Sequence, residues 1–254
     1  MKAPHRGPWP LLALAAAAAV ILTSGCTLWR LNEARTLARD SQPHEQRPNN
    51  ALLHMLVVGD STGVGTGASQ ADRSVAGLLG QAHPKLAIHN RARDGAKFDE
   101  VPAQLTAARG GPDAGYDLIL ISVGGNDVIR GTDAAELRQD IELAFAAARQ
   151  RLAPDGLVLV QAPGMVGNSP FFAPPLSVLM NSRAEDLHAA VKAAASNHGV
   201  QVIDMARPKD DDPFVQNPEL NASDGLHPSD AGYKLWRDEL LAQSDLGQRL
   251  APAK

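Results

Sequence analysis

The sequence predicts an α/β fold in which helices cover both faces of a parallel sheet. Five apolar runs of strand length occur in the chain, at residues 52–58, 85–90, 116–123, 156–162 and 200–205. Their apolarity is continuous rather than alternating, which is typical of strands buried on both faces. Helical patterns follow these runs, so strand and helix alternate five times. The alternation indicates a three-layer α/β sandwich with right-handed crossovers.

The expected helices cover residues 70–82, 97–109, 133–152, 177–198 and 229–241. Thr132 or Asp133 is a suitable N-cap for the third of them, and Gly199 is a suitable C-cap for the fourth. The chain of 254 residues, 44% of them hydrophobic, is long enough to bury a core without disulfides. Its single cysteine excludes an intramolecular disulfide and a cysteine-cluster metal site. Residues 51–254 are therefore predicted to form one domain.

An export signal is predicted at the N-terminus. Lys2 and Arg6 precede an uncharged run over residues 11–22, and small residues follow it. This order is typical of a secretory signal peptide. The sequence TSGC at its end resembles a bacterial lipobox, in which the cysteine, here Cys26, is lipidated and begins the mature chain. We therefore expect residues 1–25 to be a signal peptide and the protein to be a lipoprotein of the bacterial cell envelope that faces the periplasm.

The anchor has an alternative form. Thr23 stands where a lipobox most often has leucine, and residues 11–29 carry no charge over 19 positions, which is long enough for a membrane-spanning helix. Residues 26–50 are expected to be a tether that contains one short helix. Loss of residues 1–25 would remove two of the 24 basic residues and none of the 28 acidic ones, which takes the net charge from −4 to −6. Such a chain gives no support to nucleic-acid binding.

The loop GDSTGVGTG, residues 59–67, follows the first strand directly. Gly63, Gly65 and Ala68 fit the spacing of a dinucleotide-binding turn. However, the acidic residue expected near the end of the next strand is missing, and Asp60 is one of two extra residues before the first of these glycines. A phosphate-binding P-loop needs a lysine that the loop lacks. These comparisons favour a third interpretation, in which the loop carries a nucleophile.

Ser61 is the candidate nucleophile, and DGLHP near the end of the chain supplies the base that a serine hydroxyl needs. Asp224 and His227 are three residues apart, so both can reach one site from one turn. Asp224 can orient the imidazole and stabilise its protonated form. Pro228 is expected in the first turn of the following helix.

The other histidines have simpler explanations. His54 and His89 fall inside strand patterns, where a structural role is expected. His188 and His198 lie on or at the end of a helical pattern and are expected on the surface. Only the histidine of DGLHP has an acid so close to it in a loop rich in glycine and proline.

An oxyanion hole can be formed by the backbone N–H groups of Ser61 and Gly95 and by the side-chain amide of Asn126. These residues belong to the loops that follow the first three strands, in GDS, RARDG and GGND. In a parallel sheet such loops share the carboxyl edge, where α/β proteins bind ligands. Asp127, next to Asn126, is expected to tie its loop through hydrogen bonds.

Together these motifs resemble the SGNH-hydrolase, or GDSL-like esterase, superfamily. The similarity covers GDS at 59–61, Gly95, GGND at 124–127 and DGLHP at 224–228, within residues 52–241. It implies a flavodoxin-like α/β/α fold with five parallel strands in the order 2-1-3-4-5, and serine-esterase chemistry without metal or cofactor. The signature residues that it implies are Ser61, Gly95, Asn126 and His227, with Asp224 completing a catalytic triad.

Three features bear on the substrate. Thr62 stands where the superfamily more often has leucine, and we interpret the glycines after it as clearance around the serine. Residues 164–180 are apolar and irregular and either line an acyl pocket or pack the loop. Arg91 and Arg93, close to Gly95, could meet polar or anionic groups of a substrate.

The expected function is a serine ester hydrolase that acts through an acyl-enzyme on acyl esters of the lysophospholipase or carboxylesterase type. Its partners would be a small-molecule or lipid ester and, through the lipidated N-terminus, a membrane; the sequence does not indicate an oligomeric state. A competing substrate is the O-acetyl group of envelope polysaccharides. Two competing functions are a metal-dependent hydrolase that uses Asp60, Asp224 and His227, and a non-catalytic envelope lipoprotein that keeps the fold.

Overall fold

The computed structural model describes residues 29–108, 112 and 115–251. The expected signal peptide over residues 1–25 and the candidate lipidation site Cys26 lie outside the described residues. Within the described part, no helix has both the length and the apolarity needed to cross a membrane.

Five parallel strands form one sheet: β1 (Leu53–Gly59), β2 (Leu86–Asn90), β3 (Tyr116–Ser122), β4 (Leu152–Gln161) and β5 (Gln201–Ile203). Their order is β2-β1-β3-β4-β5, which confirms the predicted topology. β4 starts earlier than its apolar run because Leu152 already pairs with Tyr116, and the register then shifts before Leu118.

The described helices after β1 are α2 (Ser61–Val64), α3 (Val75–Ala82), α4 (Val101–Ala107), α5 (Gly125–Arg130), α6 (Ala134–Arg151), α7 (Leu176–His198), α8 (Pro213–Gln216), α9 (Asp230–Ala242) and α10 (Leu246–Leu250). Asp133 is the N-cap of α6, since its side chain accepts hydrogen bonds from the N–H groups of Ala135 and Glu136. Gly199 ends α7 in the left-handed conformation, as expected. The N-cap of α9 is Ser229, so the prediction that Pro228 lies in its first turn is wrong.

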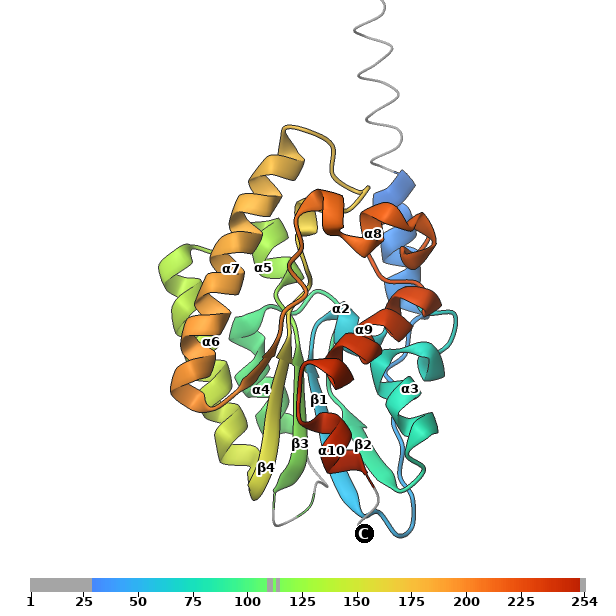
Figure 1. Ribbon diagram of the computed structural model, residues 1–254, viewed down its shortest axis with the longest axis vertical. Coiled ribbons are helices and arrows are strands. Elements are labelled where there is room, and N and C mark those ends of the chain that lie inside the picture. Colours follow the sequence, from blue (N-terminus) through green and yellow to red (C-terminus); the bar gives the residue numbers. More distant parts are fainter. Residues whose placement is uncertain (1–28, 109–111, 113–114, 252–254) are drawn as a thin grey trace, which may run out of the picture.

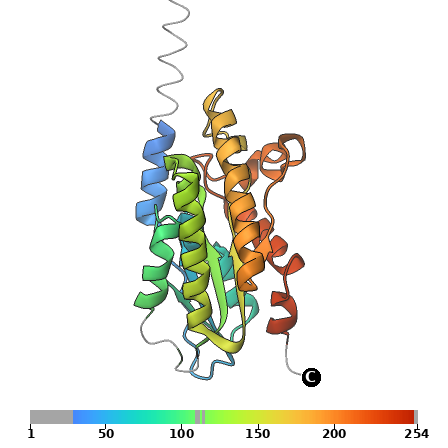
Figure 2. The ribbon, with the colours of Figure 1, turned by 90° about the vertical axis from the view of Figure 1, so that its left-hand side faces the viewer.

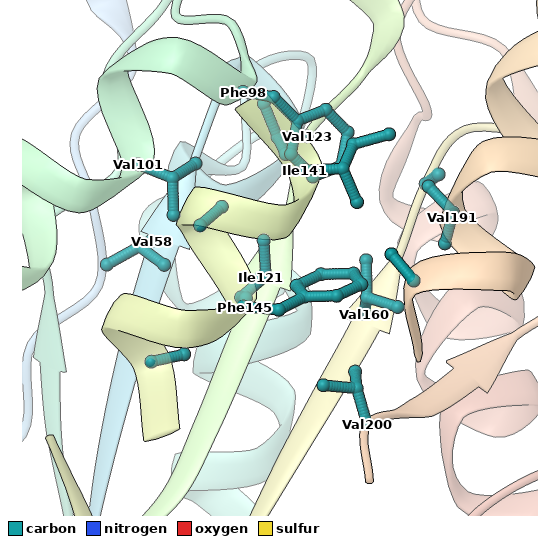
Figure 3. Close-up of a cluster of buried hydrophobic side chains, with 14 of the residues drawn as sticks. Val58, Phe98, Val101, Ile121, Val123, Ile141, Phe145, Val160, Val191 and Val200 are labelled. Atoms are coloured by element: carbon teal, nitrogen blue, oxygen red, sulfur yellow. The ribbon is translucent and has the colours of Figure 1, made fainter. Parts of the chain in front are cut away.

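Helices cover both faces of the sheet (Figures 1 and 2), and each face has its own apolar core. On one face α4, α6 and α7 pack on the central strands, where the rings of Phe98 and Phe145 meet edge to face at 6.4 Å (Figure 3). On the other face α3, α9 and α10 pack on the sheet through Leu79, Tyr233 and Leu246, all fully buried. The strands are therefore buried on both sides, which explains their continuous apolarity.

Residues 29–40 form a helix before β1, and the segment that follows it contacts the domain. Gln46 makes two backbone hydrogen bonds with Ile88 of β2, at 2.8 and 3.0 Å, in an antiparallel bridge. Glu45 forms an ion pair with Arg91. The segment that follows the helix thus contacts β2, one of the two edge strands of the sheet, at Gln46, whereas the domain boundary at residue 51 stays a prediction.

Candidate active site

Ser61 lies at the carboxyl edge of the sheet, where β1 turns into α2. Gly59 makes this turn with φ of +132°, and a Cβ atom on it would stand 1.8 Å from the carbonyl oxygen of Ser122. Only glycine fits such a turn. Asp60 then caps α2 by accepting a hydrogen bond from the N–H of Thr62, so that Ser61 occupies the first helical position.

The structure brings Ser61, His227 and Asp224 together in one chain of hydrogen bonds. The Oγ of Ser61 is 2.9 Å from Nε2 of His227, and Nδ1 of His227 is 2.6 Å from Oδ2 of Asp224. Ser61 and His227 are each 9% exposed, and Asp224 is fully buried. Both distances lie within the range in which a base can take a proton from a nucleophile.

The second oxygen of Asp224 fixes the loop that carries the histidine. Oδ1 accepts hydrogen bonds from the backbone N–H groups of Leu226 and His227, at 2.9 and 3.0 Å. Burial alone would raise the pKa of Asp224, but the hydrogen bonds and the charge of His227, together with these backbone bonds, lower it below its ordinary value. The carboxylate is therefore held ionised beside the imidazole.

The three candidate oxyanion donors line the same cavity as the serine. The N–H of Ser61 belongs to the first turn of α2 and has no partner within the helix. Gly95 adopts φ of +79°, and Asn126, at the start of α5, uses one amide N–H to bond the carbonyl oxygen of Ala96 at 3.1 Å. The second N–H of that amide is available to an oxygen in the cavity.

Side chains from distant elements hold the serine loop, and the sequence analysis did not single them out. Gln104 of α4 bonds both backbone groups of Gly59, at 2.6 and 2.9 Å. Asn90, at the end of β2, donates to the carbonyl oxygen of Gly63 at 2.8 Å. The buried hydroxyl of Tyr233 in α9 donates to the carbonyl oxygen of Thr66 at 2.7 Å. The loop is thus fixed from both faces of the sheet.

The space beside the glycines of the serine loop is filled by neighbouring loops of the protein and is not open to substrate. The interpretation of these glycines as clearance around the serine is therefore wrong. A Cβ on Gly63 would stand 2.8 Å from Cβ of Ala92. On Gly67 it would stand 2.5 Å from the carbonyl oxygen of Pro228 and 2.9 Å from Cβ of His227. The absence of side chains lets the histidine loop and the loop after β2 approach the serine loop.

Two buried carboxyl groups, those of Asp60 and Asp127, belong to the loops that carry Ser61 and Asn126. Thr62 donates its N–H and its hydroxyl to Oδ1 of Asp60, at 2.8 and 2.7 Å, and burial raises the pKa of Asp60 although these bonds oppose the shift. Burial also raises the pKa of Asp127 to about 6, against the hydrogen bonds from the hydroxyl of Thr132 and the N–H of Phe98. The expectation that Asp127 ties its loop by hydrogen bonds is confirmed. Among the described residues, no cluster of three His, Cys, Asp or Glu side chains suits a metal ion.

Of the remaining histidines, His89 has the structural role that was predicted, whereas His188 is not the surface residue that was predicted. His89 is buried and bonds the hydroxyl of Tyr116 at 2.9 Å, as expected of a structural residue. His188 is 5% exposed and bonds the carbonyl oxygen of Pro163 at 2.9 Å, so its prediction as a surface residue is wrong. It lies on the buried face of α7, and the helical periodicity of the apolar residues around it could have shown this.

A cavity of about 470 Å³ opens above the triad. Much of its lining is apolar, from Ile129, Met165, Val166, Phe171 and Leu226 among others, and Gly164, Met165, Val166, Ser169 and Phe171 come from residues 164–180. That segment also packs the body, because Phe172 and Met180 are buried. Arg91 and Arg93 do not line the cavity; they pair with Glu45 and Glu100.

Comparison with known proteins identifies the family of this chain. A sequence profile described as the GDSL-like lipase/acylhydrolase family matches residues 57–235. The chain belongs to the GDSL-like lipase/acylhydrolase family. It is therefore a hydrolase that acts on ester bonds, as the sequence predicted. A search of curated protein sequences returned no match.

Solved structures similar to this GDSL-like hydrolase share its fold at low sequence identity. An extracellular lipase from Streptomyces rimosus is 19% identical with a TM-score of 0.57, and the match covers 76% of this chain and 100% of the lipase. A lipase/acylhydrolase from Enterococcus faecalis is 19% identical with a TM-score of 0.56, over 80% of this chain and 100% of its own. The esterase EstA from a Pseudoalteromonas species, which monoethylphosphonate inhibits, is 16% identical with a TM-score of 0.56, over 78% and 98%.

Proposed function

We propose that the protein is an envelope serine esterase that cleaves acyl esters of the lysophospholipase or carboxylesterase type through an acyl-enzyme. The observation that carries the proposal is the hydrogen-bonded chain from Ser61 through His227 to Asp224 at an apolar cavity. A cavity lined largely by apolar side chains with a few convergent polar groups suits a ligand with a hydrocarbon part. An acetyl group on a polysaccharide would not need such a lining, so longer acyl groups are favoured.

In the proposed mechanism Nε2 of His227 takes the proton of the Ser61 hydroxyl while Oγ attacks the ester carbonyl carbon. The N–H groups of Ser61 and Gly95 and the amide of Asn126 stabilise the oxyanion that forms. The C–O bond to the alcohol then breaks, and His227 gives its proton to the leaving oxygen. Water attacks the acyl-enzyme with His227 again as base, which releases the acid and restores the serine hydroxyl. Asp224 keeps Nδ1 protonated throughout.

The envelope location rests on the predicted lipobox and on the distribution of exposed apolar side chains. Trp29, Leu31, Leu176, Val178 and Leu179 are exposed, at 37 to 69%. They belong to the start of the 29–40 helix and the first turn of α7, which lie at the same end of the molecule (Figures 1 and 2). An apolar rim at the end nearest the anchor suits a protein held against a lipid surface.

The test is hydrolysis of p-nitrophenyl esters from acetate to palmitate by the wild type, Ser61→Ala and, as a matched control, Ser196→Ala on the exposed face of α7. We expect Ser61→Ala to lower kcat by about 10⁴-fold or more and Ser196→Ala to leave it unchanged. Hydrolysis that survives Ser61→Ala, or labelling of that variant by a fluorophosphonate probe, would defeat the proposed nucleophile. Activity abolished by a chelator would favour the metal-dependent hydrolase.

Two further results would redirect the proposal. A wild type that cleaves acetyl esters only would favour the polysaccharide deacetylase, and one that cleaves no ester would favour the non-catalytic lipoprotein. The anchor is tested separately by metabolic labelling with palmitate in the bacterial host. We expect the label on the wild type to be lost in Cys26→Ala, and equal labelling of both would contradict lipidation at that residue.

A further inference from the structure

We propose that the helix over residues 29–40 forms one wall of the binding site for the acyl chain, and that its inner face sets which chain lengths are hydrolysed well. The inference rests on the proposed esterase function and assigns a place to the acyl group of its substrate. The family match begins at residue 57, so this wall would come from a part of the chain outside the matched region.

One face of the helix lines the cavity that contains the triad. Leu31, Ala34, Arg35 and Ala38 line it together with Ser61 and other residues of the site. Their spacing of three, one and three residues places all four on one side of an α-helix. The wall and the nucleophile therefore belong to one continuous space.

Three of these four residues, Leu31, Ala34 and Ala38, are apolar, and they lack the packing that apolar side chains on a helix normally have. Leu31 is 37% exposed, and Ala34 and Ala38 are only half-buried. In a globular protein such a stripe usually packs against the core. Here it faces the cavity, where a hydrocarbon chain would cover it and remove its apolar surface from water.

The rest of the lining matches a hydrocarbon chain as well. Met165, Val166 and Phe171 come from the loop between β4 and α7, and Leu226 comes from the histidine loop. Methionine adapts to irregular apolar ligands because its side chain is unbranched and flexible. The alanines at positions 34 and 38 leave room that larger side chains would fill.

One contact near the start of the helix and one in the segment that follows it join the helix to the rest of the domain. Near its start, the hydroxyl of Ser223 donates to Oε1 of Glu33 at 2.7 Å. Ser223 precedes the triad carboxylate Asp224 directly in the chain. Beyond its end, Gln46 pairs with Ile88 on the edge of the sheet. The wall is thus joined to the same framework that positions the nucleophile and the base.

The proposal is tested by measuring how kcat/KM of the purified full-length protein depends on the length of the acyl chain. The same detergent is present in every assay, so that any competition between detergent and substrate for the cavity is the same for all variants. Ala34→Trp should fill the cavity beside the helix. Each methylene that the substrate buries fully contributes up to about fourfold in kcat/KM. We therefore expect kcat/KM for the octanoate and palmitate esters to fall by about tenfold or more. The acetate ester should change by less than about twofold, since a two-carbon acyl group has little hydrocarbon surface to bury against the wall.

Asn32→Trp is the matched control, because Asn32 is exposed on the same helix and does not line the cavity. It should keep the wild-type profile. Leu31→Ala is a second variant that only removes atoms from a half-exposed site, and it should lower the palmitate rate by a few fold while sparing acetate. Equal profiles for Ala34→Trp, Leu31→Ala and Asn32→Trp would overturn the proposal.

A binding measurement separates this proposal from the esterase mechanism. The Ser61→Ala variant is titrated with a fluorescent fatty acid, with and without Ala34→Trp. We expect the added tryptophan to weaken binding by about tenfold, whether or not esters are hydrolysed. Unchanged binding would overturn the acyl wall. If the added tryptophan weakens binding but the ester hydrolysis assay shows no dependence on Ser61, the acyl wall is upheld and the esterase mechanism is refuted.

Discussion

Asp224 can be tested by substitution with asparagine, because its two oxygens have different partners. Oδ1 accepts two backbone N–H groups, from Leu226 and His227, and Oδ2 faces Nδ1 of His227. An asparagine must keep its side-chain oxygen toward the two N–H groups, since an amide nitrogen cannot accept hydrogen bonds from them. Its NH₂ group then faces Nδ1, which becomes the acceptor, and the proton moves to Nε2. The imidazole would donate to Ser61 instead of taking its proton.

We therefore expect Asp224→Asn to lower kcat by about 10⁴-fold, equivalent to about 5 kcal/mol of transition-state stabilisation. The folded structure should persist, because both backbone hydrogen bonds remain. The assay is hydrolysis of a p-nitrophenyl ester beside a thermal unfolding curve, with Asp238→Asn on the exposed side of α9 as the control. A loss of less than tenfold in a folded Asp224→Asn protein would refute the tautomer argument and Asp224 as the orienting acid.

Two further predictions concern the loops behind the site. Gly67→Ala should destabilise the fold by about 2 kcal/mol or more and lower kcat, because φ is +97° and the new Cβ would meet Pro228 and push the histidine loop outward. Asp127→Asn should flatten the pH dependence of the free energy of unfolding. The raised pKa of Asp127, about 6, stabilises the fold below about pH 4, and that stabilisation of up to about 3 kcal/mol is lost as pH rises through 6.

Each of these has a matched control. Gly199→Ala also places alanine at a positive φ, +60°, but its Cβ would meet nothing within 4 Å, so it should cost stability without lowering kcat. If Gly199→Ala lowers kcat as much as Gly67→Ala, contact with the histidine loop is not the cause. Denaturant titrations at about pH 4.5 and 7.5 check Asp127→Asn against Asp238→Asn. An Asp127→Asn protein whose stability changes with pH as steeply as the wild type would contradict the titration of this carboxyl group.

The fold could be predicted because its evidence is local. Each strand is a continuous apolar run, and each motif follows a strand, so parallel pairing alone places Ser61, Gly95 and Asn126 at one edge. The acid and base are also visible in the sequence because Asp224 and His227 are three residues apart. These features need no knowledge of distant contacts.

The supports of the serine loop could not be predicted, because they depend on tertiary contacts. Gln104 lies 45 residues from Gly59, and Tyr233 lies 167 residues from Thr66. Nothing in the spacing of a glutamine on a helix or a tyrosine near the C-terminus indicates a buried bond to a loop. The helix at 29–40 was itself expected within the tether, but its contact with the cavity could not be predicted, because that contact arises only when the chain folds.

The antiparallel bridge at Gln46 also matters for how this protein is handled. β2 is one of the two outer strands of the sheet, and an uncovered outer strand offers its backbone groups to other chains. Gln46 bonds the backbone of Ile88 and donates its side-chain amide to the carbonyl oxygens of His83 and Leu86. A recombinant protein trimmed to start at residue 51 would lose this cover, and the backbone N–H and C=O of Ile88 that Gln46 pairs with would then be open to other chains.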